Sequence, residues 1–567
     1  MADLVLGPML RYVGDRDATV WVETDAACEV EVLGARERTF HVEGHHYALV
    51  LVEGLAPDSS TPYAVRLDGR RVWPPDDGRP PCRIVTRGGE DRARLVFGSC
   101  RIGAPHREPW TLPPSEHPQG FGVDALWAYS NRLQRGDEEW PDCVLLMGDQ
   151  VYADEVPPDT REYMREREER DRAARDRSAA PPPGEVADFE EYTRLHRESW
   201  SEPDIRWLLS TVPSTMIFDD HDVHDDWNIS AAWRERQRRL PWWRERICGA
   251  YMAYWIYQHI GNLSPGHMGD EPMLDEVKRD EDAGPRLRRF ALAADEDSTS
   301  SRFAFHRDFG RTRLVVIDSR AARVLTPGAR EMVDAEEWRW IVDRTEGDHD
   351  HLILASTLPV FMAPAVHHLQ AWNERVCDGA WGRPAAAVGE RIRQALDLDH
   401  WPSFARSFRR MEDLLRLRGG DAGGPPPAGI LLLGGDVHTA YVAEVDCGPA
   451  VRSRVWQLVC SPFRKPLAPR ERRLIRALFT RPARALTSAM ARAAGAPRQT
   501  VSWRVRSGPT FDNSVGVVEV QGRAARVTVR RTGAGGDPTE LSGLHQQDLT
   551  GGRRPAGRRR RGRRGSP

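Results

Sequence analysis

Lysine, paired cysteines and long apolar runs are all scarce in this sequence of 567 residues. Its only two lysines are Lys278 and Lys465, so nearly all of the 81 basic residues are arginine, and the formal net charge of −3 gives no overall attraction to nucleic acid. The eight cysteines have no paired spacing, which argues against a disulfide framework or a zinc ribbon. No apolar run reaches the roughly 18 residues that a transmembrane helix needs, and the N-terminus has no pattern of a signal peptide. These absences predict a cytoplasmic protein, with peripheral membrane contact as an alternative.

The pattern of apolar residues changes near residue 90. Short alternating runs separated by turn residues fill residues 1–88 and predict a small β-sandwich of the immunoglobulin or fibronectin kind. Over residues 92–535, buried strands alternate with helical stretches, which predicts a larger α/β domain. Charged and aromatic helical stretches within 155–295 are expected to be insertions in that domain. Residues 536–567 are rich in arginine and are predicted to be a disordered tail.

Four apolar runs of the larger domain end abruptly in side chains that can bind a metal ion. Open α/β sheets build their sites at the carboxyl ends of the strands. We therefore expect the four ends to converge, although each of them alone has an ordinary structural explanation. The runs end in Gly98-Ser99-Cys100, Gly148-Asp149-Gln150-Val151-Tyr152, Asp219-Asp220-His221-Asp222 and Gly435-Asp436-Val437-His438.

Carboxylates gathered at one place raise one another's pKa and oppose folding unless cations neutralise them. Two or more metal ions remove this repulsion. They also generate a hydroxide near neutral pH and stabilise the attacking and leaving oxygens of a phosphoryl displacement. The sequence therefore predicts a multinuclear hydrolytic centre that uses a metal-activated hydroxide. The carboxylates concerned are Asp149, Asp219, Asp220, Asp222, Asp225, Asp226 and Asp436.

The order and spacing of these motifs resemble the PhoD-like alkaline phosphatase family of the metallophosphoesterase superfamily. The resemblance extends over roughly residues 1–535 and includes Phe309-Gly310, Asp318-Ser319-Arg320 and Phe511-Asp512-Asn513. It implies a four-layer α/β/β/α domain behind a small β-sandwich. It also implies that the protein is an enzyme that hydrolyses phosphoric monoesters or diesters with bound iron and calcium.

The resemblance assigns roles to residues that match the family's motifs. Cys100 and Tyr152 become ligands of ferric iron, and Asp149 becomes a bridging ligand. Thiolate and phenolate are strong donors for ferric iron, whereas carboxylates suit calcium. Manganese, magnesium or zinc can take the place of either metal, because calcium is scarce in cytoplasm. The metal ligands predicted in this way are Cys100, Asp149, Tyr152, Asp220, Asp225, Asp226, Asn228, Asp436 and His438.

Two residues are candidates for catalysis, and their roles stay open. His221 is interpreted as a metal ligand, a general acid for the leaving group, or a donor to phosphate. Arg101 directly follows Cys100 and either clamps a phosphate oxygen or is an ordinary surface arginine. Which of Asp225, Asp226 and Asn228 coordinates a metal is also left open.

Residues 464–492 carry nine basic residues against one acid, Glu471, with apolar residues among them. A basic amphipathic helix can lie on an anionic membrane, but a surface helix packed on its own domain has the same pattern. This segment and the tail predict weak contact with anionic membranes or nucleic acid. The alternative function is a binding scaffold with a vestigial phosphatase site. The predicted partner is a phosphate-ester substrate, and no obligate protein partner is evident.

Overall fold

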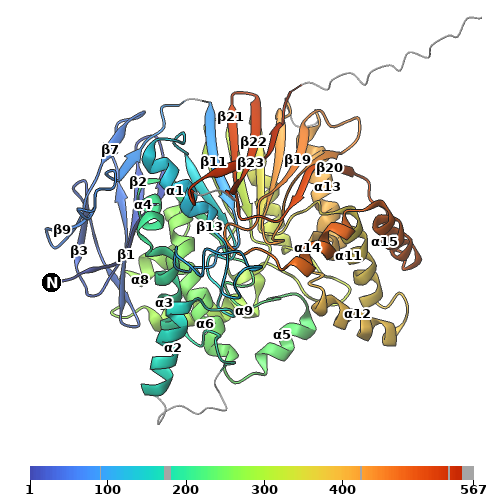
Figure 1. Ribbon diagram of the computed structural model, residues 1–567, viewed down its shortest axis with the longest axis horizontal. Coiled ribbons are helices and arrows are strands. Elements are labelled where there is room, and N and C mark those ends of the chain that lie inside the picture. The colour runs from blue at the N-terminus through green and yellow to red at the C-terminus, as the bar shows by residue number, and fades with distance from the viewer. Residues whose placement is uncertain (90, 171–180, 422–423, 534–536, 552–567) are drawn as a thin grey trace, which may run out of the picture.

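The computed structural model describes residues 1–89, 91–170, 181–421, 424–533 and 537–551. Its N-terminal part is built from two four-stranded antiparallel sheets and a two-stranded pair (Figure 1). One sheet has the order β1 (Leu4–Val13), β2 (Ala18–Thr24), β6 (His45–Val52), β5 (Phe40–Val42). The other has the order β4 (Ala35–Arg38), β3 (Glu29–Val32), β8 (Val65–Leu67), β9 (Arg70–Trp73), and the pair is β10 (Arg83–Val85) with β7 (Ser60–Pro62).

The two N-terminal sheets form a sandwich that is docked on the rest of the protein. Val20 and Val65 belong to the core between the sheets, whereas Trp21, on the opposite face of β2, belongs to the core of the larger domain. This is the alternation that a strand buried on both faces requires. Arg11 is buried and donates to the carbonyl oxygens of Tyr257 at 2.7 Å and Gln258 at 2.8 Å. The sandwich therefore supports the helical insertion beside it.

Two mixed sheets form the centre of the larger domain. The six-stranded sheet has the order β13 (Ser214–Ile217), β12 (Cys143–Met147), β11 (Arg92–Gly98), β21 (Ser514–Gln521), β22 (Ala524–Thr532), β23 (Leu541–Asp548). The seven-stranded sheet has the order β14 (Phe305–Phe309), β15 (Thr312–Ile317), β16 (His351–Ser356), β17 (Gly429–Gly434), β19 (Arg454–Val459), β18 (Ala440–Asp446), β20 (Ser502–Thr510). Within these sheets, β11, β12 and β13 run parallel to one another, as do β15, β16, β17 and β19.

Side chains of β15 show how the layers stack. Leu314 and Val316 join the core shared with the six-stranded sheet, and Val315 and Ile317 join the core on the opposite face. Helices α10 (Ala335–Arg344) and α13 (Ala405–Gly419) contribute buried apolar residues to that outer core. On the other side, α1 (Ala125–Arg135) packs against β21 and β22. The predicted α/β/β/α order of layers behind a β-rich N-terminal region is confirmed.

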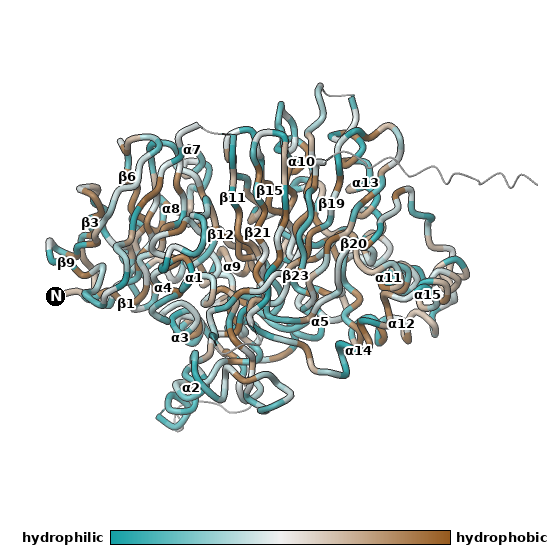
Figure 2. Tube along the Cα trace, turned by 45° about the horizontal axis from the view of Figure 1, so that its top comes forward, coloured by the Kyte–Doolittle hydropathy of each residue, from teal (hydrophilic) through white to brown (hydrophobic). Residues whose placement is uncertain are grey.

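The remaining helices follow individual strands along the chain, and two of them, α2 and α6, differ clearly in burial. Helix α2 is hydrophilic (Figure 2) and buries only Thr160, as its charged sequence predicts, while residues 171–180 of that predicted stretch lie outside the described residues. The aromatic stretch 241–260 is buried, as α6 running into the π-helix η2. The helices are α2 (Pro158–Arg170), α3 (Phe189–Trp200), α4 (Pro203–Thr211), α5 (Ala231–Arg238), α6 (Trp243–Ala253), η2 (Tyr254–His259), η3 (Ile260–Asn262), α7 (Pro265–Met268), α8 (Pro272–Val277), α9 (Gly284–Glu296), η4 (Ser298–Ser300), α11 (Pro364–Cys377), α12 (Arg383–Ala395), η5 (Trp401–Ser403), α14 (Pro469–Leu478) and α15 (Arg481–Ala493).

The predicted start of the disordered tail, residue 536, is too early in the sequence. Residues 541–548 form β23, which pairs with β22 and adds an edge strand to the six-stranded sheet. The sequence of this strand is too polar to predict a strand, and it is held by the backbone ladder and by the buried side chains of Leu541 and Leu549. The rest of the predicted tail, 552–567, lies outside the described residues. Among the described helices, none is both long and apolar enough to cross a membrane.

Candidate metal centre

The four predicted ligand motifs meet at one edge of the two sheets. Cys100 follows β11, Asp149 follows β12 and Asp220 follows β13, and these three strands are parallel neighbours. Asp436 follows β17 of the facing sheet. The backbone N–H of Cys100 donates to the carbonyl oxygen of Gly148 at 3.2 Å, so the first two strand ends are joined directly. Carboxyl ends of parallel strands therefore bring the four motifs together.

The backbone of these loops is held in an unusual conformation. Among the described residues, eleven that are not glycine have a positive φ, and six of them lie in the predicted ligand motifs. Such conformations cost free energy and collect at functional sites, where they aim a side chain that regular backbone would turn away. The six are Cys100, Asp149, Asp226, Asn228, Asp436 and His438.

Two groups of ligand atoms lie close enough together to hold a metal ion. One donor atom each from Cys100, Asp149 and His438 lie within 4.8 Å of one another, and so do single atoms of Asp149, Asp220 and Asp436. Asp149 belongs to both groups, which is the position of a bridging ligand. The hydroxyl of Tyr152 donates to Oδ2 of Asp149 at 3.4 Å and so lies beside the first group.

The thiol of Cys100 is buried and surrounded by hydrogen-bonding groups. Ser461 Oγ donates to its Sγ at 3.2 Å, and Ser99 Oγ lies 3.3 Å away. Burial, and then the carboxylates of Asp149 and Asp436, raise the pKa of the thiol well above its usual value, while the two serine hydroxyls oppose that rise. A cation at this position would be needed to hold the thiolate.

Buried carboxylates of the centre are incompletely paired. Burial, together with neighbouring carboxylates, raises the pKa of Asp149 and Asp219 well above the usual range and that of Asp220 to about 6. Asp149 Oδ1 and Asp219 Oδ2 are buried and have no hydrogen-bond partner among the described residues. Buried polar atoms are nearly always satisfied in folded proteins. These two oxygens therefore fit the metal ions that the sequence implies.

Arg320 is the residue of this centre whose role the sequence did not predict. Its guanidinium is buried, pairs with Asp219 and places Nη2 3.1 Å from Asp220 Oδ1. The same group lies 2.5 Å from Asp399 and 3.8 Å from Asp436. It thus links carboxylates that come from the ends of both sheets. Its place in the Asp318-Ser319-Arg320 motif directly after β15 was the available signal.

Asp222 and Asp154 act as supports. Asp222 accepts the backbone N–H groups of Asp149 at 2.9 Å and Asp219 at 2.8 Å, so its carboxylate ties two strand ends together. Asp154 accepts from Nδ1 of His221 at 2.9 Å. Burial lowers the pKa of His221, but Asp154 and Asp149 outweigh it and raise that pKa well above its usual value. The ring of His221 lies beside the ring of Tyr152, with ring centroids 4.8 Å apart.

His438, Lys465 and His400 complete the surroundings of the two groups of ligand atoms. His438 Nδ1 lies 2.7 Å from the carbonyl oxygen of Lys465, which leaves Nε2 for the centre. Lys465 Nζ lies 3.9 Å from the ring centroid of Tyr152. His400 Nε2 lies 3.4 Å from Asp436 Oδ2. Asp399 and His400 stand side by side in a segment that carries no ligand-like spacing, so the sequence offered no signal for them.

Besides Tyr152, three predicted ligands are not part of the two groups. Asp225 is exposed, and its Oδ1 lies 3.8 Å from Nε2 of His221. Asp226 donates its backbone N–H to Asp220 at 3.2 Å, and its side chain is absent from both groups. Asn228 donates its amide to the carbonyl oxygen of Arg320 at 3.2 Å, and its Oδ1 has no partner among the described residues. Of the three, only the amide of Asn228 combines burial with a free donor oxygen.

Arg101 fits neither of the two roles considered for it, a phosphate clamp and an ordinary surface arginine. Its guanidinium is buried, with Nε 2.7 Å from Asp124 Oδ2 and Nη1 2.7 Å from the carbonyl oxygen of Ser199. Asp124 in turn caps the N-terminus of α1. Sequence proximity to Cys100 does not set the direction of the Arg101 side chain, which is fixed by its partners Asp124 and Ser199. Arg101 joins α1 and α3 behind the centre.

Four layers with paired groups of metal ligands at the strand ends define a metal-dependent phosphoesterase. The chain belongs to the PhoD-like phosphatase family, since the model of that description matches residues 119–529, and it is therefore a phosphoric ester hydrolase. A second model, described as a domain of unknown function (DUF7800), matches residues 1–84.

A solved structure of PhoD shows the same fold. A structure of PhoD is similar over 96% of this chain and 88% of its own chain, with a TM-score of 0.55 and 12% sequence identity. A purple acid phosphatase, PPD1 from seeds of yellow lupin (Lupinus luteus), aligns over 92% of this chain and 71% of its own at a TM-score of 0.45 and 11% identity. Among the curated proteins, none matches this sequence.

Proposed function

We propose that the two ligand groups sharing Asp149 are the hydrolytic centre, and that it acts on phosphoric monoesters and diesters. The observation that carries this proposal is the convergence of two sets of ligand atoms on one buried carboxylate. Metal ions held there would activate a water molecule for attack and offset the charge on the phosphate oxygens. The protein contributes the fixed geometry, because every ligand comes from the end of a buried strand.

The two groups differ in their donor atoms, and this difference supports two different metals. The first offers the thiolate of Cys100, the imidazole of His438 and a carboxylate, with the phenol of Tyr152 alongside. Sulfur, nitrogen and phenolate donors suit ferric iron. The second offers the carboxylates of Asp149, Asp220 and Asp436, which suit calcium, with magnesium or manganese as substitutes. His400 beside Asp436 adds a nitrogen donor that favours manganese or zinc over calcium at that subsite.

His221 is proposed as the proton donor to the leaving oxygen. Asp154 fixes its Nδ1, and this carboxylate raises the pKa of the ring and so favours its protonated form. Coordination of a metal through Nε2 is the alternative role. A proton donor and a ligand predict different results for His221→Asn, since only loss of a ligand lowers the metal content.

Hydrolysis of p-nitrophenyl phosphate and bis-p-nitrophenyl phosphate tests the proposal. Asp436→Asn and treatment with a strong chelator are expected to lower turnover at least about 100-fold, since a ligand carboxylate is lost or the metals are removed. Asp548→Asn is the matched control, because Asp548 is an exposed aspartate on β23 that pairs with Arg526. Unchanged turnover in Asp436→Asn would refute the proposed centre.

The iron assignment has its own optical test. Tyrosinate bound to ferric iron gives a visible charge-transfer band, so the purified protein is expected to be coloured and Tyr152→Phe colourless. Tyr163→Phe is the matched control, since its hydroxyl binds Glu190 on α3. An active but colourless and iron-free enzyme would contradict the iron assignment and leave the hydrolase proposal intact.

A further inference from the structure

Helices α14 and α15 present a basic face that is not neutralised. Seven arginines of these helices form no ion pair with any residue in the described part of the chain, and all are at least partly exposed. The one acid, Glu471, is used to accept the backbone N–H of Ala468 at 2.8 Å. We call this set the arginine face. Its members are Arg470, Arg472, Arg473, Arg476, Arg481, Arg484 and Arg492.

The apolar sides of the same helices are covered only in part, since Leu474 of α14 is 59% exposed and Leu486 of α15 is 65% exposed. Ala491 of α15 is buried in one cluster with Trp372 and Val376 of α11. Phe479, at the end of α14, packs against Tyr441 with ring centroids 5.8 Å apart. A helix that lies in a membrane needs a free apolar side. Helix α15 therefore packs on its own domain, and one large apolar side chain on each helix, Leu474 and Leu486, stays strongly exposed.

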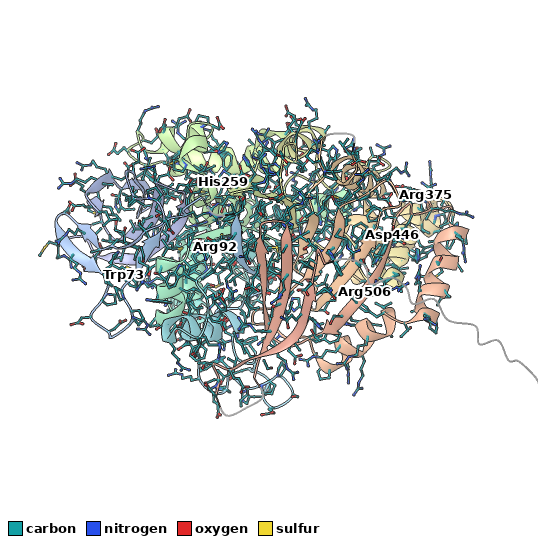
Figure 3. The ribbon with its side chains drawn as sticks, turned by 90° about the horizontal axis from the view of Figure 1, so that it is seen from above. Trp73, Arg92, His259, Arg375, Asp446 and Arg506 are labelled. Atoms are coloured by element: carbon teal, nitrogen blue, oxygen red, sulfur yellow. The ribbon has the colours of Figure 1, made fainter. Side chains whose placement is uncertain are left out.

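A large groove continues the arginine face. It has a volume of about 2020 Å³ and lies between the start of α15 and strands β18 and β20, on the side where Figure 3 labels Asp446 and Arg506. Glu444 is neutralised twice, by Arg454 at 2.9 Å and by Arg506 at 2.9 Å. Six arginines line the groove against three acids: Arg452, Arg454, Arg481, Arg484, Arg504 and Arg506 against Glu444, Asp446 and Asp548.

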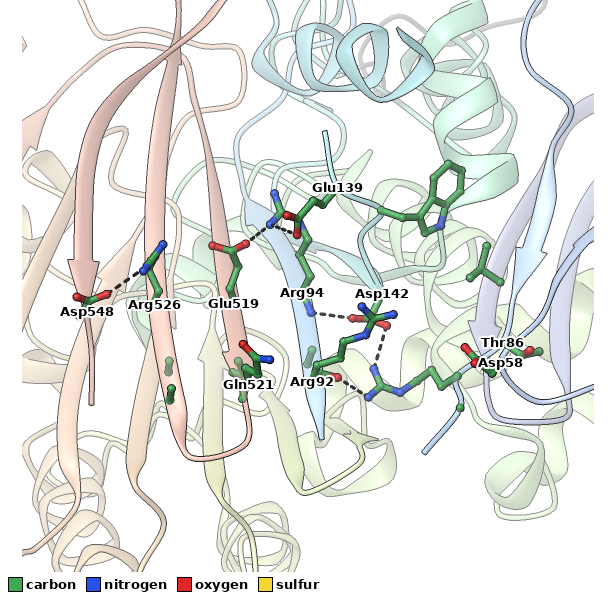
Figure 4. Close-up of a pocket in the computed structure, with 18 residues that line it drawn as sticks. Asp58, Thr86, Arg92, Arg94, Glu139, Asp142, Glu519, Gln521, Arg526 and Asp548 are labelled. Atoms are coloured by element: carbon green, nitrogen blue, oxygen red, sulfur yellow. Dashed lines mark hydrogen bonds and ion pairs between the residues drawn. The ribbon is translucent and has the colours of Figure 1, made fainter. Parts of the chain in front are cut away.

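A second cavity, in which the charged side chains pair with one another, serves as a comparison for the groove. It has a volume of about 670 Å³ and lies at the opposite ends of β11 and β12 from the metal centre (Figure 4). There Arg94 pairs with Glu519 and Glu139, and Arg526 pairs with Asp548 at 3.1 Å. The arginines of this cavity are neutralised by ion pairs within the protein, so the cavity is a poor binding site for an anion. The groove differs because Arg481, Arg484 and Arg504 have no such partner among the described residues.

We propose that the arginine face and the groove bind the phosphate backbone of a nucleic-acid strand. Unpaired arginines supply bidentate contacts to phosphate. A concave groove accepts a flexible strand, whereas a flat bilayer would not reach its floor. Trp503 in the floor is 9% exposed and offers no free face for base stacking, so recognition is independent of sequence.

This binding site is separate from the hydrolytic centre. Strand β18 starts beside His438 and ends at Asp446 in the groove, roughly 25 Å further at about 3.3 Å per residue. The arginines of α14 lie along the chain between Lys465, at the centre, and Arg481, at the groove. The inference therefore does not rest on the proposed hydrolysis, and small-ester turnover is expected to be unchanged when the groove is altered.

Fluorescence anisotropy with labelled single-stranded oligonucleotides of several sequences tests the proposal on the full chain. Affinity is expected to be the same for all sequences and to fall steeply with salt, because contacts to phosphate release counterions. Replacing Arg481, Arg484 and Arg504 together by Ala is expected to lower affinity at least about 10-fold and to make the salt dependence shallower. The matched control replaces Arg38, Arg244 and Arg289, three exposed arginines elsewhere, and is expected to bind like the original protein.

A chain that ends at Gly551 separates the groove from the arginine-rich residues that follow it. The affinity that remains in this chain is expected to depend on the same three arginines. The proposal is overturned if the triple replacement binds as tightly as the control. It is also overturned if removal of residues 552–567 abolishes all binding, or if the protein sediments with anionic phosphatidylserine vesicles while it binds no oligonucleotide.

Discussion

Arg320 Nη2 lies 3.1 Å from Asp220 Oδ1 inside the metal centre, and both side chains are buried. The same guanidinium pairs with Asp219 and lies 2.5 Å from Asp399. A fixed cation among several buried carboxylates reduces their mutual repulsion and sets the positions of those proposed to hold the second metal. Arg320 is therefore a positioning residue for the second subsite.

Arg320→Met is expected to weaken the second subsite while the first keeps its metal. Loss of one partner from buried charge pairs costs about 3–5 kcal/mol, so the metal-free protein should melt well below the unaltered one. Added calcium or manganese should recover part of that loss. Calorimetric titration of metal and thermal melting measure both effects, and Arg320→Lys, which keeps the charge, should lie between the two proteins. Equal metal affinity in all three would contradict this role.

Ser461→Ala is expected to weaken iron binding by about 10-fold, as is usual for groups that support a ligand. Its hydroxyl donates to Cys100 Sγ at 3.2 Å and opposes the rise in the thiol's pKa. The variant should therefore need a higher pH than the unaltered protein to load iron, as followed by the visible band. Ser514→Ala is the control, because Ser514 Oγ lies 3.5 Å from the thiol of Cys460, which is no predicted ligand. Identical loading curves would refute this role of Ser461.

Arg101→Met is expected to lower stability without changing recognition of the ester. The substitution leaves Asp124 buried without its guanidinium partner, which costs about 3–5 kcal/mol. Thermal melting and steady-state kinetics separate the two effects. If the variant instead shows a raised KM at an unchanged melting temperature, Arg101 binds a phosphate oxygen of the ester and this account of it is wrong.

His45 is expected to stabilise the docked sandwich only below alkaline pH. Its two nitrogens lie 3.1 Å from Glu23 and 2.9 Å from Glu190 of α3. Burial lowers its pKa, but these carboxylates outweigh burial and raise the pKa to about 9. A raised pKa contributes stability that is complete below about pH 6.5 and is lost as pH rises through 9.

Thermal melting of His45→Gln across that pH range checks the sign. The difference from the unaltered protein should be largest near pH 6, on the order of 2 kcal/mol after allowance for partial exposure, and should vanish near pH 10. A difference that grows with pH would contradict the pairing.

The sequence predicted the layers and the converging strand ends, because both follow from local patterns. Buried strands such as Leu314–Ile317 show continuous apolar runs, and Asp149 and Asp436 follow such runs directly. Contacts between distant segments have no such signal. Arg320 reaches Asp399 across 79 positions of sequence, and β23 becomes a strand only because β22 offers it a ladder.

The error at Arg101 has the same origin. The sequence shows that Arg101 is next to Cys100, but it does not show where the side chain of Arg101 points. That direction depends on Asp124 and Ser199, which are 23 and 98 positions away. The roles of Asp225, Asp226 and Asn228 were left open for this reason also. Their exposure and partners are set by packing against Asp154 and Arg320.

Counting the metal ions in single-ligand variants tests the shared role of Asp149 most directly. Elemental analysis of the purified protein is expected to give at least two metal ions per chain. Cys100→Ala should lose the iron and keep the second metal, while Asp149→Asn should lose both, since its carboxylate belongs to both groups. If Asp149→Asn keeps one metal at full occupancy, as Cys100→Ala does, Asp149 is not a bridging ligand and the account of this centre is wrong.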